Sequence, residues 1–199
     1  GNQANGISSA SYGTNNTAAQ EGSAAFGNTN QALGSFGTAV GSFNTARASS
    51  NAFGLQNNAN GDSSNALGNL NIANGAFSAA VGRGNLSGGR ESNAFGIGND
   101  ASAEGSSAFG AYNMSSGVFS SALGRGNEAT GSASSALGTL NFAQGALSSA
   151  VGTDNQALAD GSSAHGRGNI ACEYFLDLLP IVRVHLQNLN PRMLKVPIY

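Results

Sequence analysis

Bulky apolar, small and polar positions alternate in a short phrase that returns along the whole chain. The phrase reads Ser-x-Ala-apolar-Gly and occurs, for example, at residues 106–110. Its closing glycine recurs every 14 residues, with a single step of 13. The closing glycines are Gly13, Gly27, Gly41, Gly54, Gly68, Gly82, Gly96, Gly110, Gly124, Gly138, Gly152 and Gly166. Twelve copies in one register identify a repeat protein, in which each copy is a structural unit that stacks on its neighbours.

The residues just before the closing glycine predict a short strand with two different faces. A bulky apolar residue precedes the glycine in eleven of twelve copies, and alanine precedes that residue in eleven. This period of two places the bulky side chains on one face and alanine on the other. We expect the bulky residues to pack in the core or between chains; they include Phe26, Phe53, Leu67, Val81, Phe95, Phe109, Leu123, Leu137 and Val151. The pattern leaves open which face lines the interior.

An asparagine follows each closing glycine by three residues, and a small residue comes two positions later. Asparagine suits a turn because it tolerates left-handed backbone and bonds to it, and stacked asparagines can form an amide ladder. The expected turn residues include Asn71, Asn85, Asn99, Asn113, Asn127 and Asn141. Each copy therefore reads as two short strands and two turns, which is one coil of an all-β parallel solenoid. Coils that rise by one strand spacing, roughly 4.8 Å each, would form a rod about 55–60 Å long.

The one short copy, between Gly41 and Gly54, places Arg47 and Ala48 where other copies have a second glycine. We therefore expect the missing residue to fall in a corner, so that both strands of this copy stay whole.

Composition changes this picture little. Of the 199 residues 30 are glycine and only 9% are charged, which alone would suggest disorder, but a disordered tract has no reason to keep a register. A net charge of −2 offers no basic field for nucleic acid. The single cysteine, Cys172, rules out a disulfide within the chain. We find no signal peptide and no transmembrane run, and expect the chain to be a fragment of a larger protein.

The repeat ends at Ala171, and the composition changes after it. Residues 172–199 contain all three prolines and no glycine. The sequence thus predicts a solenoid over residues 1–171 and a tail over 172–199. We interpret the tail as a non-native segment; the alternative is a capping segment that covers the last coil.

The repeat resembles the head repeats of YadA-like trimeric autotransporter adhesins. Residues 73–82 and 143–152 are copies that carry this resemblance, through Ala-x-Gly at mid-repeat and the Ser-x-Ala-apolar-Gly phrase. The resemblance implies a left-handed parallel β-roll, with three chains side by side on the outer surface of a Gram-negative bacterium. It also implies attachment to host extracellular-matrix proteins such as collagen, fibronectin or laminin, or to host cells. A homotrimer is expected on physical grounds too, because a 14-residue coil is too thin to enclose its bulky column, and a long exposed apolar stripe marks an interface.

Candidate chemistry is sparse. His165 replaces the apolar residue in the last copy, and three such histidines at a threefold axis could bind a metal or an anion, although a harmless polar substitution is the favoured interpretation. Arg83, Arg125 and Arg167 recur three coils apart and are weak candidates for contacts with an acidic partner. We expect no catalytic residue, no cofactor and no bound nucleic acid. The leading hypothesis is a multivalent adhesin head anchored through a C-terminal region outside this chain, the alternative is a phage tail-fibre solenoid that binds glycans, and an enzyme ranks last.

Overall fold

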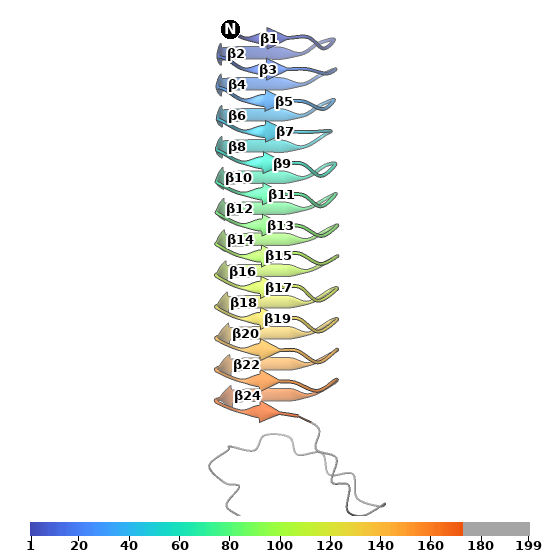
Figure 1. Ribbon diagram of the computed structural model, residues 1–199, viewed down its shortest axis with the longest axis vertical. Coiled ribbons are helices and arrows are strands. Elements are labelled where there is room, and N and C mark those ends of the chain that lie inside the picture. Colours follow the sequence, from blue (N-terminus) through green and yellow to red (C-terminus); the bar gives the residue numbers. More distant parts are fainter. Residues whose placement is uncertain (173–199) are drawn as a thin grey trace, which may run out of the picture.

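Two parallel sheets run along the molecule, and each repeat contributes one strand to both. The computed structural model describes residues 1–172. Within that range long strands of five residues alternate with short strands of two (Figure 1). The long strands are β2 (Ala10–Thr14), β4 (Ala24–Asn28), β6 (Thr38–Ser42), β8 (Asn51–Leu55), β10 (Asn65–Asn69), β12 (Ala79–Arg83), β14 (Asn93–Ile97), β16 (Ser107–Ala111), β18 (Ser121–Arg125), β20 (Ser135–Thr139), β22 (Ser149–Thr153) and β24 (Ser163–Arg167).

The short strands each hold one outward and one inward residue. They are β1 (Gln3–Ala4), β3 (Thr17–Ala18), β5 (Gln31–Ala32), β7 (Thr45–Ala46), β9 (Asn58–Ala59), β11 (Ile72–Ala73), β13 (Leu86–Ser87), β15 (Asp100–Ala101), β17 (Met114–Ser115), β19 (Glu128–Ala129), β21 (Phe142–Ala143), β23 (Gln156–Ala157) and β25 (Ile170–Ala171). The inward residue is alanine or serine throughout, and from β3 onward it is buried.

Each strand pairs in parallel with its counterpart one repeat away. The long strands form a 12-stranded sheet in the order β2 to β24, and the short strands form a 13-stranded sheet in the order β1 to β25. Pairing keeps the repeat register, so that Leu67 lies opposite Phe53 on one side and Val81 on the other. The chain is therefore a parallel β-solenoid with 14-residue coils, as the sequence predicted, and the coils stack into a rod (Figure 1).

The 13-residue copy keeps both of its strands. Thr38 of β6 lies opposite Asn51 of β8, and Gly41 lies opposite Gly54, so the long sheet continues without a shift of register. The short sheet continues as well, from β7 to β9. The missing residue falls in the loop between β7 and β8, which confirms the expectation that a corner absorbs the deletion.

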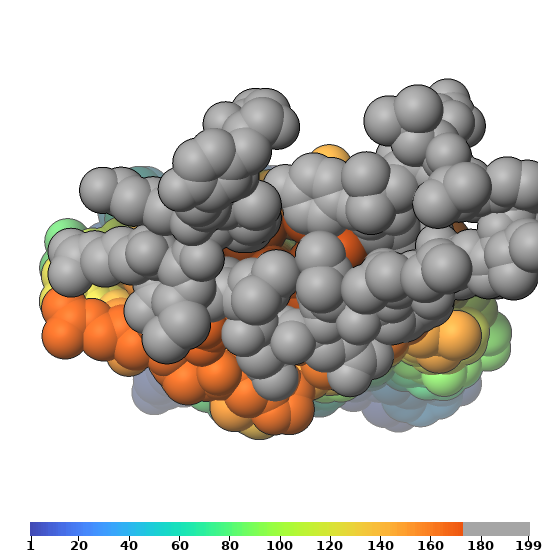
Figure 2. Space-filling model, turned by 90° about the horizontal axis from the view of Figure 1, so that it is seen from below, coloured from blue at the N-terminus to red at the C-terminus, as the bar shows by residue number. Residues whose placement is uncertain are grey.

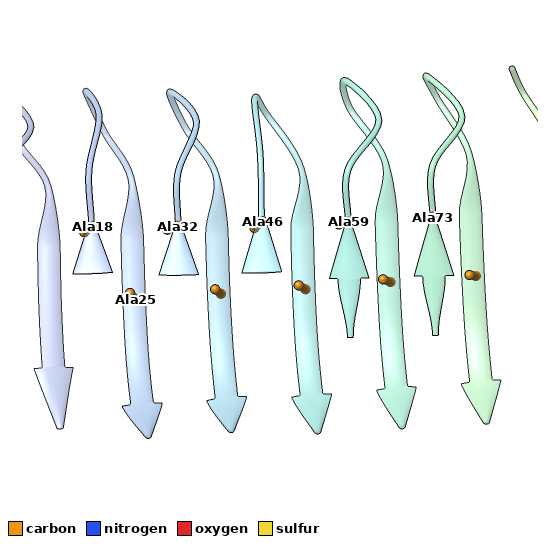
Figure 3. Close-up of a cluster of buried hydrophobic side chains, with 10 residues drawn as sticks. Ala18, Ala25, Ala32, Ala46, Ala59 and Ala73 are labelled. Atoms are coloured by element: carbon orange, nitrogen blue, oxygen red, sulfur yellow. The ribbon is translucent and has the colours of Figure 1, made fainter. Parts of the chain in front are cut away.

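The interior is built from small side chains. Ala52 and Ala66 of the long sheet and Ala59 and Ala73 of the short sheet are 0% exposed, and equivalent alanines recur from coil to coil (Figure 3). Viewed along the rod, the coils have a flattened outline (Figure 2). The structure thus answers the question that the sequence left open: alanine lines the interior, and the bulky column faces outward. A core of methyl groups buries little apolar surface per coil, so hydrogen bonds between coils carry much of the stability.

The asparagines of the repeat form a continuous buried ladder. Asn99 is 1% exposed, and both its backbone N–H and its Nδ2 donate to Oδ1 of Asn85, each at 3.0 Å. Its Nδ2 also lies 2.9 Å from the carbonyl oxygens of Phe95 and Gly110. The expected turn residues Asn71, Asn85, Asn99, Asn113, Asn127 and Asn141 all lie in this ladder, between a long strand and the next short strand. The ladder ties each coil to the one before and the one after.

Left-handed backbone occurs at the corners, one residue earlier than the asparagine. Leu70, which precedes Asn71, has a φ of 58°, and every coil has the same conformation at this position. A second corner residue, such as Phe77 with a φ of 59°, is left-handed in the loop before each long strand. The closing glycines adopt φ between 112° and 121°, which only glycine tolerates well.

The predicted tail over 172–199 lies outside the described residues except for Cys172, which is half-buried and unpaired. No helix in the described part of the chain is long and apolar enough to cross a membrane.

Candidate functional site

The outer face of the long sheet carries a nearly continuous apolar column, made of the residue before each closing glycine. Five of its side chains are 36–39% exposed, and they are Phe26, Phe53, Leu67, Phe109 and Leu123. The others between Val40 and Val151 are half-buried; they are Val40, Val81, Phe95, Leu137 and Val151. In-register pairing aligns these residues down the whole sheet, and Phe95 stacks on Phe109 with ring centroids 5.0 Å apart. Neighbouring coils thus cover the sides of each residue, and the face that remains open is a long apolar stripe.

The outer face of the short sheet differs in chemistry. The first residue of each short strand from β3 to β25 points outward, and it is polar or charged in seven of these twelve strands, including Thr17, Asn58 and Glu128. Apolar residues such as Ile72 interrupt the polar ones. This face changes from coil to coil and has no uniform stripe.

One carboxyl group on the short-sheet face is held in an unfavourable environment. Asp100 lies in register between Leu86 and Met114, and its Oδ1 is buried without a hydrogen-bond partner. Burial raises the pKa of the Asp100 carboxyl, and a hydrogen bond from Ser102 opposes this only in part.

The candidate binding residues do not converge on one point. Arg83, Arg125 and Arg167 are the exposed last residues of β12, β18 and β24. Because they recur at every third coil, roughly 14 Å separates each from the next. They form a sparse row along one edge of the rod and do not make a joint anion site in a single chain.

His165 occupies the last position of the apolar column. It lies opposite Val151 and is exposed, and its carbonyl oxygen accepts a hydrogen bond of 2.7 Å from Asn169. Within residues 1–172 no group of three or more His, Cys, Asp or Glu side chains is placed to hold a metal ion. A metal site at His165 would therefore need further copies of the chain.

The two edges of the rod carry features that the sequence reasoning missed. We define the turn edge as the segment from the last residue of a long strand to the following ladder asparagine, and the loop edge as the segment between a short strand and the next long strand. In Figure 1 the turn edge lies at the left of the stack and the loop edge at the right. Eight bulky apolar residues at these edges have positive φ: Phe36, Phe43, Leu70, Phe77, Tyr112, Phe119, Leu140 and Leu147. A left-handed conformation costs a bulky residue roughly 1 kcal/mol, and these eight side chains are 48–72% exposed.

The edges also differ in charge. Among the described residues, the turn edge holds three arginines and one acid, and the acid is Asp154. The loop edge holds five acids and two arginines: Glu21, Asp62, Glu91, Glu104, Asp160, Arg47 and Arg90. At the loop edge Arg90 lies 3.0 Å from Glu91 and 3.8 Å from Glu104, and its guanidinium sits 5.8 Å from the centre of the Phe77 ring. The turn edge is thus net positive and the loop edge net negative.

Comparison of the chain with known protein families and with curated proteins finds no match.

Over residues 1–172 the geometry therefore offers repeated surfaces and no concentrated site. Its largest uniform feature is the apolar column, its most variable feature is the short-sheet face, and its two edges are opposite in charge. A rod of this kind presents nearly the same surface many times along its length.

Proposed function

We propose that this chain is the head module of a trimeric bacterial surface adhesin, built as a left-handed β-roll and displayed at the outer membrane. Three parallel copies pack with their long-sheet faces toward a common axis and their short-sheet faces toward the outside. Attachment is to host extracellular-matrix proteins or host cells, and it is multivalent because three copies repeat each surface.

The apolar column is the observation that supports this proposal. It runs along the long sheet, has six apolar side chains that are 36% or more exposed, and finds no space in an interior made of alanine. An apolar stripe of this length on one face is typical of a surface that another subunit covers. The short-sheet face has no such stripe, so it is left for the ligand.

The first experiment measures the oligomeric state. Size-exclusion chromatography with light scattering should give three times the 19.7 kDa of one chain. The substitution Leu123→Asp places a charge in the column and should give monomers. The matched control is Ile72→Asp on the short-sheet face, because both side chains are 38% exposed. A monomeric wild-type protein, or equal effects of the two substitutions, would contradict the proposed packing.

The second experiment measures binding of the same proteins to immobilised collagen, fibronectin and laminin and to a glycan array. The trimer should bind a matrix protein at least about 100-fold more tightly than the Leu123→Asp monomer, because avidity is lost. Binding to glycans alone would instead favour the tail-fibre alternative.

A further inference from the structure

The bulky left-handed residues of the edges have a conformational cost, and their backbone N–H groups bond to the preceding coil while their side chains stay largely uncovered. Glycine occupies the equivalent corner in other coils, at Gly84 and Gly105 for example, and adopts the same backbone without strain. Apolar side chains that are about half exposed or more gain little from burial within their own chain. A second protein surface that buries these side chains would supply the missing stabilising free energy.

These residues occur only in pairs. Corner positions follow one another along the chain at intervals of seven residues, or six in the short copy, and alternate between the two edges. Each bulky apolar corner has another in an adjacent corner. The pairs are Phe36 with Phe43, Leu70 with Phe77, Tyr112 with Phe119, and Leu140 with Leu147. No such residue occurs singly among the described coils.

The members of a pair cannot touch within one chain. Leu70 lies at the turn edge after β10, and Phe77 lies at the loop edge after β11, so the strand between them holds them on opposite sides of the rod (Figure 1). They do, however, lie within half a coil of each other along the rod, roughly 2.4 Å in height. If the turn edge of one copy lies against the loop edge of another at equal height, the two side chains meet.

The chain itself holds some of these side chains in place for such a contact. The ring of Phe36 lies over Gly22 of the preceding coil, where a Cβ atom would collide with it, and Tyr112 lies over Gly98 in the same way. A small residue beneath each ring keeps it at the edge of the rod. Its other side stays open to a partner.

The charges of the two edges favour the same arrangement. The turn edge is net positive and the loop edge net negative, so like edges repel and unlike edges attract. A contact between unlike surfaces of identical chains is heterologous, and rotation about one axis closes it into a ring.

We propose that the turn edge of each copy packs against the loop edge of the next copy, with the four apolar pairs completed across this seam. The proposal rests on the trimeric packing proposed above, since it requires parallel copies at equal height. It adds the contact that sets their vertical register, because a shift by one coil would separate at least one pair and a shift by two coils would separate all four.

Disulfide crosslinking tests the seam. In a Cys172→Ser background, Leu70→Cys and Phe77→Cys are combined in one chain, and the purified protein is oxidised mildly. Within one chain the two sites lie at opposite edges of the rod, and the length of a five-residue long strand, roughly 13 Å, separates these edges. A disulfide needs Cα atoms within about 7 Å, so any bond that forms must join two chains. We expect dimer and trimer bands on denaturing gels, which disappear on reduction.

The control pair is Leu70→Cys with Phe119→Cys, which lie at different levels of the stack and should not crosslink. If neither pair crosslinks while light scattering still reports a trimer, the edge seam is wrong and the trimer stands. If both pairs crosslink equally, the register is wrong. A monomeric protein overturns the seam together with the trimer on which it rests.

Discussion

Replacing one asparagine of the buried ladder tests how the stack is held together. In Asn99→Leu the side chain keeps its approximate size but loses all of its hydrogen bonds. The amide Nδ2 can donate two bonds to the three oxygens around it, and Oδ1 accepts bonds from the backbone N–H and Nδ2 of Asn113, both at 3.0 Å. Four buried bonds at a net value of about 1 kcal/mol each give a loss of about 4 kcal/mol.

Urea denaturation followed by circular dichroism measures this loss. With an m-value of about 2 kcal/mol/M, the midpoint should fall by about 2 M at constant protein concentration. The control is Asn74→Leu at the loop edge, because Asn74 is exposed and accepts a single bond, from Asn60 at 2.9 Å. It should cost about 1 kcal/mol or less. If the two substitutions shift the midpoint equally, the ladder does not stabilise the stack and the reasoning is wrong.

Three further substitutions test the backbone and one half-buried carboxyl group. Gly96 has a φ of 120°, and a Cβ atom there would collide with the carbonyl of the next coil, so Gly96→Ala should cost at least about 3 kcal/mol in the same assay. Gly84→Ala, at a φ of 63° with open space around it, should cost about 1 kcal/mol, and equal losses would contradict the collision. Because burial raises the pKa of Asp100 above its usual 3.8, the folded state binds the proton more tightly, and stability falls as the pH rises through that raised pKa. Asp100→Asn should therefore raise Tm at pH 7 and have little effect at pH 3, whereas equal shifts at both pH values would refute a titration at this site.

The strands, the corners and the ladder could be predicted because each depends on the repeat itself. A period of two before the closing glycine defines the long strand. The deletion beside Arg47 falls in a loop, and the ladder bonds from Asn57 to Asn44 are kept. When an asparagine is buried in every copy, its amide can complete its hydrogen bonds only with the neighbouring coils of the stack. These predictions needed only the chemistry of single residues and the regular spacing of the repeat.

The orientation of the long strand was harder to predict. Alternation distinguishes two faces but does not say which one points inward, since that depends on the distance between the two sheets. The available signal was the alanine of the short strand, such as Ala73, which shares one buried cluster with Ala66 and Ala80 of the long strands. Two opposed columns of alanine indicate sheets too close for phenylalanine. The left-handed corners were missed because Leu70 and Phe77 are residues that seldom adopt positive φ.

The division between constant and variable positions bears on how the proposed adhesin head could change its ligand. Interior alanines, ladder asparagines and closing glycines recur in nearly every coil, because each contacts its own counterpart in the next coil. Outward residues of the short strands have no such constraint, and they range from Thr45 to Phe142. Substitutions on this face can therefore alter recognition without disturbing the stack or the apolar column. In the proposed trimeric adhesin head, folding and assembly then depend on the long sheet, the ladder and the edges, and specificity depends on the short sheet.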